Sequence, residues 1–298
     1  MKTDEVRAWQ NAVLDEVFAA IASDAVLTSI LIFKGARVLA QLLPDAARRS
    51  LDLDANVTAD FLNRYPDSQE RAAFVRAQLQ AALRRHFEAG SPVRHELEGV
   101  RVEPKPPHGH PRGWNALQAQ IRIRDLSRPG ARGLPALTLD LAAPEWLSEH
   151  STTTLEIAGQ RVTAYTLERV AGEKLRAFLS TTPAYQVKKL GMRETLRVKD
   201  LPDLAKILRQ SPISDREFWR VVGEEFRLAC ESRGVDCAGW SSFEAVESLA
   251  RETYGKDATV AGAVPFDEAW AAVHAIVDHF AEARVVPFEF PLPERPAN

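Results

Sequence analysis

The segment that decides the fold reads Arg48-Arg49-Ser50-Leu51-Asp52-Leu53-Asp54-Ala55-Asn56-Val57. Side chains alternate between the two faces of an extended strand, so Asp52, Asp54 and Asn56 are expected on one face and the apolar residues on the other. Two carboxylates on one face repel each other unless a cation lies between them. Oxygen ligands of this kind suit Mg²⁺, which completes its shell with water and phosphate oxygens. The segment is therefore either a metal-binding strand or an Asp-rich turn at a solvated edge.

A strand–glycine–helix unit precedes this segment and favours the metal-binding interpretation. We predict a buried strand at Leu27–Phe33, a tight turn at Gly35 and a helix over Ala36–Leu43. A glycine lets the backbone approach phosphate oxygens, and the N-terminus of the following helix favours anions. The two strands should pair on either side of this short helix.

A third carboxylate follows in a predicted hairpin. Two alternating stretches, Trp114–Arg124 and Leu134–Ala142, flank a turn-rich connection. Asp140 lies at the centre of the second stretch, where burial of a carboxylate would be costly without a partner. It either faces solvent or is the third acid of a two-metal centre.

Composition describes an ordinary globular protein of 298 residues with 45% hydrophobic and 27% charged residues. No apolar run reaches membrane-spanning length, and the N-terminus lacks the features of a signal peptide. Cys230 and Cys237 are the two cysteines, and we expect both to be reduced thiols. We therefore predict a cytoplasmic protein with no membrane partner.

The net charge of −3 conceals a basic region. Residues 71–135 carry twelve Lys and Arg against five Asp and Glu, whereas residues 201–298 carry ten against seventeen. Basic side chains around a carboxylate site suit a polyanionic substrate that must also meet a metal ion. The alternative is that these arginines are solvated surface residues.

The pattern becomes helical after residues 145–159, which we expect to be a linker. Thr166 is a candidate N-cap for a helix with Glu173 and Lys174 at its middle. Asp200 and Asp203 are one helical turn apart and should face the same way. The sequence thus predicts an α+β fold with a mixed sheet flanked by helices over residues 1–158, and a mainly helical domain over residues 159–298.

The first half of the chain resembles the polymerase-β-type minimal nucleotidyltransferase fold. It shares that fold's glycine-plus-D-x-D signature in Lys34-Gly35 and Arg48…Ser50-x-Asp52-Leu53-Asp54, with Asp140 in the place of the third acid. The second half resembles the AbiEii/AbiGii toxin-type nucleotidyltransferases, which include the MenT-like toxins. That likeness lies in Ala171-Gly172-Glu173-Lys174-Leu175 and in Arg197-x-Lys199-Asp200-x-x-Asp203-Leu204.

The resemblance implies metal-assisted nucleotidyl transfer from an NTP. Asp52 and Asp54 would hold one or two Mg²⁺ (or Mn²⁺) ions, and Asp140 would join them and orient or deprotonate the attacking hydroxyl. Lys174 would reach the triphosphate as the family's lysine does, although a solvated helix lysine is the plain alternative. The implied nucleotide-binding residues are Lys34, Gly35, Ala36, Arg37, Arg48, Ser50, Lys174, Arg197, Asp200 and Asp203.

Several of these roles have structural alternatives. Asp200 and Asp203 either orient Lys174, contact the base or ribose, or are N-terminal helix acids favoured by the dipole. Arg48 and Arg197 would each either bind phosphate oxygens of the nucleotide or form an ion pair within the protein. The family's turn has small residues followed by a hydroxyl, whereas here Arg37 follows Ala36. Arg37 would either bind phosphate or block the pocket.

The resemblance also implies an acceptor and a partner. Family members add nucleotides to RNA, with the tRNA 3′ end as the expected target, and thereby stop translation; a cognate antitoxin is the expected protein partner. The basic residues 71–135 would hold an RNA backbone by charge and shape. Trp114 either stacks on a base or packs within the protein. Modification of a protein hydroxyl and a non-catalytic nucleotide- or RNA-binding module are the alternative functions.

Overall fold

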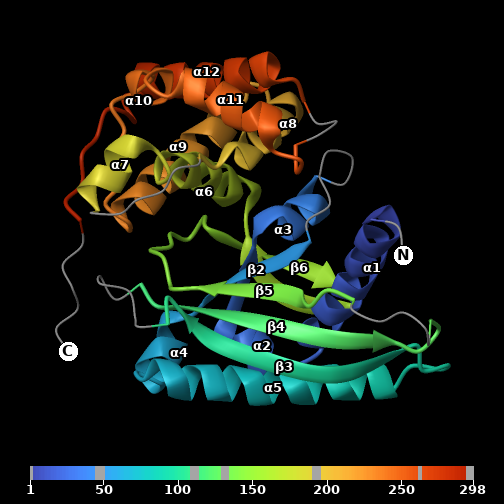
Figure 1. Ribbon diagram of the computed structural model, residues 1–298. Coiled ribbons are helices and arrows are strands. Elements are labelled where there is room, and N and C mark those ends of the chain that lie inside the picture. Colours follow the sequence, from blue (N-terminus) through green and yellow to red (C-terminus); the bar gives the residue numbers. More distant parts are fainter. Residues whose placement is uncertain are drawn as a thin grey trace.

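The protein is described here from a computed structural model that covers residues 3–43, 51–107, 114–128, 134–189, 196–260 and 264–292. Its described strands form one mixed sheet in the order β3-β4-β5-β2-β1-β7-β6 (Figure 1). The strands are β1 Leu31–Lys34, β2 Asp52–Val57, β3 His95–Lys105, β4 Ala116–Asp125, β5 Leu137–Ala142, β6 Thr152–Ile157 and β7 Gln160–Tyr165. The β2–β5 and β1–β7 pairs are parallel and the other pairs are antiparallel.

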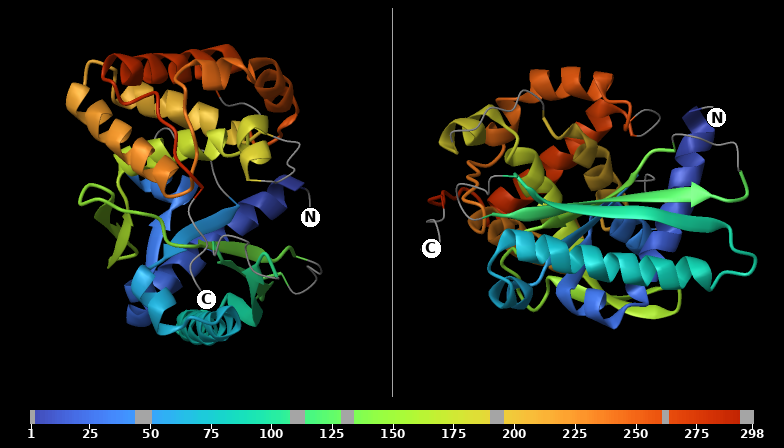
Figure 2. Two further views of the ribbon diagram at one scale, coloured as in Figure 1. Left: turned by 90° about the vertical axis from the view of Figure 1, so that its left-hand side faces the viewer. Right: turned by 60° about the horizontal axis from the view of Figure 1, so that its bottom comes forward.

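Helices cover both faces of this sheet. The helices α1 (Thr3–Ala22), α2 (Ala25–Ile30) and α5 (Ser68–Glu88) lie on one face, and the helices that follow β7 gather on the opposite side (Figures 1 and 2). The remaining helices are α3 Gly35–Leu42, α4 Ala59–Arg64, α6 Leu167–Leu179, α7 Pro183–Lys188, α8 Leu201–Gln210, α9 Arg216–Glu231, α10 Ser241–Glu244, α11 Glu247–Lys256 and α12 Phe266–Glu282. This arrangement confirms the predicted α+β class, a mixed sheet flanked by helices and followed by a helical part.

Most of the predicted local elements near the site are confirmed. β1 and β2 are antiparallel neighbours on either side of α3, with Lys34 opposite Asp54. The predicted hairpin is the antiparallel β4–β5 pair. Thr166 caps α6 by accepting a hydrogen bond from the backbone N–H of Arg169 at 3.2 Å. Cys230 and Cys237 are buried free thiols, as predicted.

The predicted strand Leu27–Phe33 is wrong over its first residues. The side chain of Asp24 accepts hydrogen bonds from the backbone N–H groups of Val26 and Leu27 at 3.0 and 2.9 Å and so begins helix α2. Such an N-cap satisfies donors that a helix start leaves unpaired, and here it outweighs the strand preference of the β-branched residues. The strand therefore begins at Leu31.

The predicted linker 145–159 is also wrong, because it contains strand β6. β6 and β7 form a hairpin whose two-residue turn, Ala158-Gly159, has positive φ at both positions, 51° and 76°. Turns of this kind match the twist of antiparallel strands. β7 then pairs with β1, so the sheet extends to Tyr165, and helix α6 begins two residues later at Leu167. The division of the chain into two domains stays a prediction.

A buried ion network joins the sheet to the helices. The guanidinium of Arg169 on α6 is fully buried and contacts Glu145 Oε2 at 3.0 Å and Glu225 Oε2 at 3.1 Å. Glu145 also lies 3.4 Å from the hydroxyl of Tyr165 on β7. Asn56 on β2 donates to that hydroxyl at 2.6 Å. The network thus connects strands β2 and β7 to helices α6 and α9.

Among the described residues, no helix combines the length and apolarity that crossing a membrane requires.

Replacing Arg169 tests how far this network holds the two parts together. An Arg169→Met variant leaves the buried carboxylate of Glu225 without its cation and removes one of the three cations around Glu145. We expect this variant to lose about 3–5 kcal/mol of unfolding free energy in urea titrations. Arg220→Met is the matched control, because Arg220 bonds Glu217 and Glu224 on the exposed side of α9. It should unfold at the wild-type urea concentration. Equal midpoints for the two variants would contradict this account.

Candidate active site

Three carboxylates converge where β2 runs parallel to β5. The register places Asp54 opposite Asp140 and Asp52 opposite Thr138. One carboxylate oxygen from each of Asp52, Asp54 and Asp140 lies within 4.8 Å of the others, and all three side chains are partly buried. Asp140 accepts hydrogen bonds from Gln118 Nε2 at 2.8 Å and Lys105 Nζ at 3.3 Å. The three predicted acids therefore form one cluster, here called the acid triad.

The electrostatics of the triad fit a bound cation. Burial raises the pKa of Asp54 to about 6, and the adjacent charge of Asp52 adds to the rise; Lys34 and Arg197 oppose it only in part. A divalent ion between the carboxylates would favour their ionised forms. An all-oxygen donor set of this charge suits Mg²⁺ or Mn²⁺ better than zinc or copper.

Gly35 is required beside the triad for two reasons. Its φ is +77°, a backbone conformation that L side chains rarely adopt. A Cβ atom at this position would also lie 2.2 Å from Asp54 Oδ2, well inside any contact distance. The glycine therefore lets the start of α3 close over the carboxylate of Asp54.

A cleft of about 320 Å³ opens beside the triad at the seam between sheet and helices. Its charged lining residues are Lys34, Asp54, Lys105, Asp140, Glu145, Glu173, Arg176, Arg197 and Arg233. Gly35 lines it too, whereas Ala142 and Ala177 contribute apolar wall. The cleft is therefore bordered by acids on the strands and by cations from both parts of the molecule.

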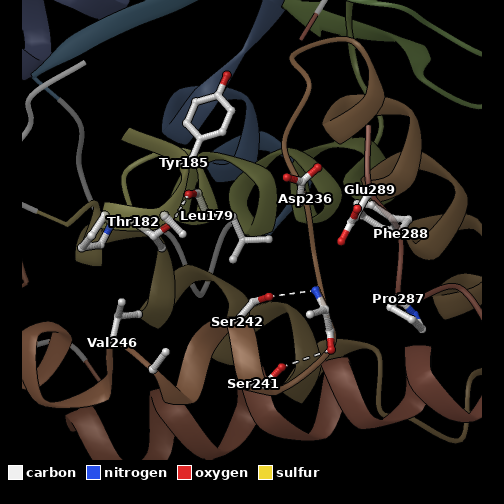
Figure 3. A pocket seen from close by; sticks show the side chains of 14 residues that line it. Leu179, Thr182, Tyr185, Asp236, Ser241, Ser242, Val246, Pro287, Phe288 and Glu289 are labelled. Atoms are coloured by element: carbon white, nitrogen blue, oxygen red, sulfur yellow. Dashed lines mark hydrogen bonds between the residues drawn. The ribbon is translucent and has the colours of Figure 1, made fainter. Parts of the chain in front are cut away.

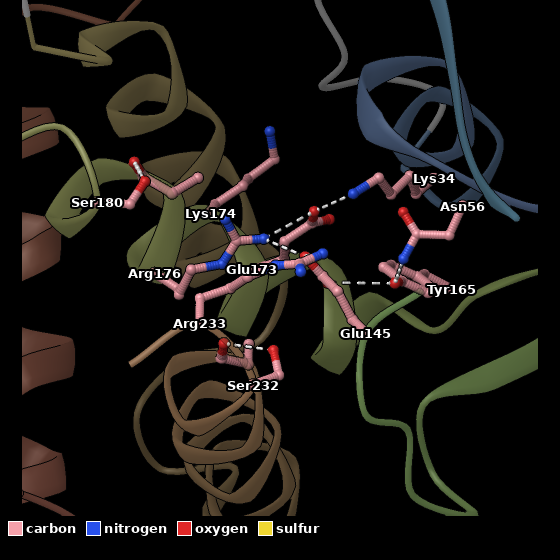
Figure 4. A network of polar contacts seen from close by, with 12 residues as sticks. Lys34, Asn56, Glu145, Tyr165, Glu173, Lys174, Arg176, Ser180, Ser232 and Arg233 are labelled. Atoms are coloured by element: carbon pink, nitrogen blue, oxygen red, sulfur yellow. Dashed lines mark hydrogen bonds and ion pairs between the residues drawn. The ribbon is translucent and has the colours of Figure 1, made fainter. Parts of the chain in front are cut away.

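Sequence reasoning missed the residues that organise the helical side of this cleft. Glu145 accepts from Arg176 Nη2 at 2.7 Å and from Arg233 Nη2 at 3.4 Å, and Glu173 forms ion pairs with Lys34 and Arg176 (Figure 4). Burial alone would raise the pKa of the Glu145 carboxyl, but the surrounding cations, Arg176 first among them, hold it well below its usual range. Arg176 directly follows the Ala171–Leu175 block, and this position is the one feature of the sequence that could have indicated a role for Arg176.

Lys174 takes a different direction from its neighbour Glu173. Its side chain is buried and its Nζ donates to Asp200 Oδ1 at 3.0 Å and Asp203 Oδ2 at 2.6 Å. Figure 4 shows it extending away from the Glu145 cluster. It shares a small recess with Gly35, Arg197 and Asp200. Of the alternatives for Asp200 and Asp203, the structure favours orientation of Lys174; direct contact of Lys174 with a triphosphate stays a prediction.

The other predicted nucleotide-binding residues have mixed outcomes. Arg37 forms an ion pair with Asp15 and donates to the side chain of Asn11 at 3.2 Å, so its described contacts hold α3 to α1. Ala36 is buried. Arg197 forms an ion pair with Asp200 at the edge of the cleft. Arg48 and Ser50 lie outside the described residues, and their roles, like that of Arg37 toward phosphate, stay predictions.

A larger cavity of about 690 Å³ lies away from this chemistry, in the helical part. It is bordered by α7, α10 and residues 287–289 (Figure 3). The hydroxyls of Ser241 and Ser242 bond backbone groups of Ala238, and Asp236 is paired with Lys188. No residue of the acid triad lines this cavity, whereas Asp54 and Asp140 line the smaller cleft, which is therefore the candidate active site.

The raised pKa of Asp54 predicts that this residue costs stability when no metal is bound. The folded protein holds the Asp54 proton more tightly than the unfolded chain does, so stability falls as the pH rises from about 4 through about 6. In EDTA at pH 7.5, Asp54→Asn should therefore be more stable than wild type by on the order of 2 kcal/mol, and the difference should vanish near pH 4. Urea titrations at both pH values measure it.

Mg²⁺ should reverse this order, because only the wild-type triad gains binding free energy. Asp278→Asn, at an exposed carboxylate of α12, should follow wild type in both buffers. A wild-type protein that is more stable than Asp54→Asn in EDTA at pH 7.5 would contradict the assignment.

The contact between Gly35 and Asp54 predicts that an added methyl group displaces a metal ligand. Gly35→Ala should lower Mn²⁺ affinity by about tenfold or more, as measured by the free-ion signal in electron paramagnetic resonance. Gly255→Ala is the control, since a Cβ there meets nothing within 4 Å. Mn²⁺ affinity equal to wild type in the Gly35→Ala protein would refute the proposed geometry.

The family profile described as nucleotidyl transferase AbiEii toxin, type IV toxin–antitoxin system, matches residues 16–283. A candidate nucleotidyltransferase from H. pylori has a TM-score of 0.53 at 14% identity, covering 94% of this chain and 99% of its own. JHP933 from Helicobacter pylori also has a TM-score of 0.53 at 14% identity, with coverages of 92% and 93%. At such identities the two structures show a shared fold alone.

No curated protein matched the chain. The family profile, however, spans nearly the whole sequence and includes the acid triad, Lys174 and the cleft. The chain belongs to the AbiEii toxin family of nucleotidyltransferases.

Proposed function

We propose that this protein is a Mg²⁺-dependent toxin that transfers NMP from an NTP to RNA, with the tRNA 3′ end as acceptor, and so blocks translation. The observation that carries the proposal is the convergence of Asp52, Asp54 and Asp140 beside a cleft lined by cations. A cognate antitoxin is the protein partner that the family suggests. Because the substrates are NTPs and tRNA, the cytoplasm is the proposed site of action.

The triad would hold the ion and position the acceptor. Mg²⁺ or Mn²⁺, when bound, neutralises phosphate oxygens and stabilises the charge that develops at the α-phosphate. Asp140 is the triad member proposed to accept the proton of the attacking hydroxyl, since its carboxylate is fixed by Gln118 and Lys105 and its side chain is 35% exposed. The hydroxyl oxygen forms a bond to the α-phosphorus, the bond from that phosphorus to the bridging oxygen breaks, and pyrophosphate leaves.

The residues around Gly35 would bind the nucleotide near the reacting phosphate. The backbone of Gly35 can approach the phosphate because no side chain intervenes. Lys174 and Arg197 share the adjacent recess, and we propose that they stabilise negative charge there. Asp200 and Asp203 keep the Lys174 ammonium in place. Lys34 lines the cleft on the strand side.

RNA is the proposed acceptor of the nucleotide because residues 71–135 carry an excess of positive charge. Residues 71–135 carry twelve basic against five acidic residues, although ion pairs within β3 and β4, such as Arg124 with Glu96 and Glu98, neutralise part of that charge. An RNA backbone would be held by the remaining excess in a salt-dependent way. The ring of Trp114 faces the guanidinium of Arg233 at 5.1 Å, which supports packing within the protein rather than base stacking.

The experiment is a transfer assay with Mg²⁺, each α-labelled NTP and total tRNA. We expect label in RNA with wild type, and a fall of about a thousandfold or more with Asp52→Asn or Asp140→Asn, because each removes a charge that the reaction needs. Asp278→Asn serves as control. Induced expression should arrest growth with wild type and not with Asp52→Asn.

Each other outcome excludes part of the proposal. Label in protein instead of RNA would favour modification of a protein hydroxyl. Nucleotide binding without any transfer would favour a non-catalytic binding module. Equal transfer by wild type and Asp52→Asn would exclude catalysis at the triad.

A further inference from the structure

The cations on the helical side of the cleft form a prearranged cluster. Lys34 on β1, Arg176 on α6 and Arg233, which follows α9, gather their charged ends around Glu145 and Glu173 (Figure 4). All five side chains line the cleft beside the triad. They are 15% exposed or less, so each is largely withdrawn from bulk water while it still borders the cleft.

The guanidinium groups of Arg176 and Arg233 each donate hydrogen bonds to the protein through only one of their two terminal nitrogens. Arg176 contacts Glu145 and Glu173 through its Nη2 atom. Arg233 also uses Nη2, which contacts Glu145 and donates to the carbonyl oxygens of Ala143 at 3.0 Å and Pro144 at 3.3 Å. Within the described part of the chain, no group accepts a hydrogen bond from Nη1 of either arginine. Each fork therefore keeps donors for a ligand that enters the cleft.

The protein holds these forks in place before any ligand arrives. Glu145 is 2% exposed and is also fixed by Arg169, whose guanidinium is completely buried. The Arg233 guanidinium lies over the ring of Trp114, 5.1 Å from its centroid. Groups fixed in this way lose little conformational entropy on binding, which is the usual property of a recognition site.

A planar fork with paired N–H donors matches the oxygens of phosphate, and two forks in one cleft match more than one phosphate group. We propose that Arg176 and Arg233, positioned by Glu145, bind the β- and γ-phosphates of the NTP, so that the cleft selects nucleotides by the length of their phosphate chain. The assignment of these phosphates rests on the proposed function, which places the α-phosphate at the acid triad. Glu145 is then a positioning residue, and the two arginines are the binding residues.

Calorimetric binding of inorganic phosphate, pyrophosphate and tripolyphosphate in the presence of Mg²⁺ tests this inference. We expect affinity to rise with chain length, by about threefold or more at each step. Arg233→Gln and Arg176→Gln should each weaken tripolyphosphate binding by about tenfold or more, because each removes charge-assisted hydrogen bonds. Arg220→Gln, at an exposed arginine of α9, should bind like wild type.

Arg233→Lys separates recognition from folding. It keeps the positive charge but loses the fork, so its tripolyphosphate affinity should fall between those of wild type and Arg233→Gln, with an unchanged thermal midpoint. The inference is overturned if wild type binds tripolyphosphate no more tightly than phosphate, or if Arg233→Gln and Arg233→Lys bind it like wild type. The binding measurement needs neither acceptor nor turnover. Tight tripolyphosphate binding without any nucleotidyl transfer would therefore refute the proposed function, together with the assignment to the β- and γ-phosphates, and would leave Arg176 and Arg233 as polyphosphate-binding residues.

Discussion

The parallel pairing of β2 with β5 places Asp54 directly beside Asp140, and the rest of the site depends on this contact. Parallel strands cannot be joined by a short hairpin, so the chain forms α4, α5, β3 and β4 between the two acids. Carboxylates brought within 4.8 Å of one another in partly buried positions repel. The pKa of Asp54 is raised mainly by burial and, after that, by the charge of Asp52. Packing elsewhere must compensate for that repulsion, which is the usual price of a preformed metal site.

The seam between the sheet and the helices is built from charges rather than from apolar contacts alone. Arg169, Glu145 and Glu225 form its buried centre, and Lys34 with Glu173 forms its edge at the cleft. A buried pair is weak support for stability as such, because desolvation offsets much of the attraction. Its value here is geometric, since the carboxylates hold two guanidinium groups at the wall of the cleft. One network therefore both connects the two parts and shapes the candidate binding surface.

Local patterns in the sequence were sufficient to predict the strand side of the site. Alternation of polar and apolar residues placed Asp52 and Asp54 on one face of β2, and Gly35 marked the turn into α3, because both signals act over a few residues. Where two local signals competed, as at Asp24 and the residues after it, the helix cap outweighed strand propensity and the prediction failed. The β6–β7 hairpin was missed although its turn residues adopt positive φ, because Ala158 gives little sign of that conformation in the sequence.

The helical side of the site could not be predicted in this way. Glu145 was assigned to a linker, and Arg233 belongs to a region whose overall charge is acidic. Their proximity to Arg176 arises from the packing of α6 on α9 and from the buried ion pairs with Glu145, to which no local spacing corresponds. Arg37 illustrates the same limit, since its place after Gly35-Ala36 suggested phosphate, while its described contacts are with Asp15 and Asn11 on α1.

The most direct test of the account is anomalous diffraction from crystals grown with Mn²⁺ and a non-hydrolysable NTP analogue. We expect a manganese peak between the carboxylates of Asp52, Asp54 and Asp140, in contact with a phosphate oxygen of the analogue. A crystal with bound analogue but no metal at the triad, or with the three carboxylates apart, would contradict it.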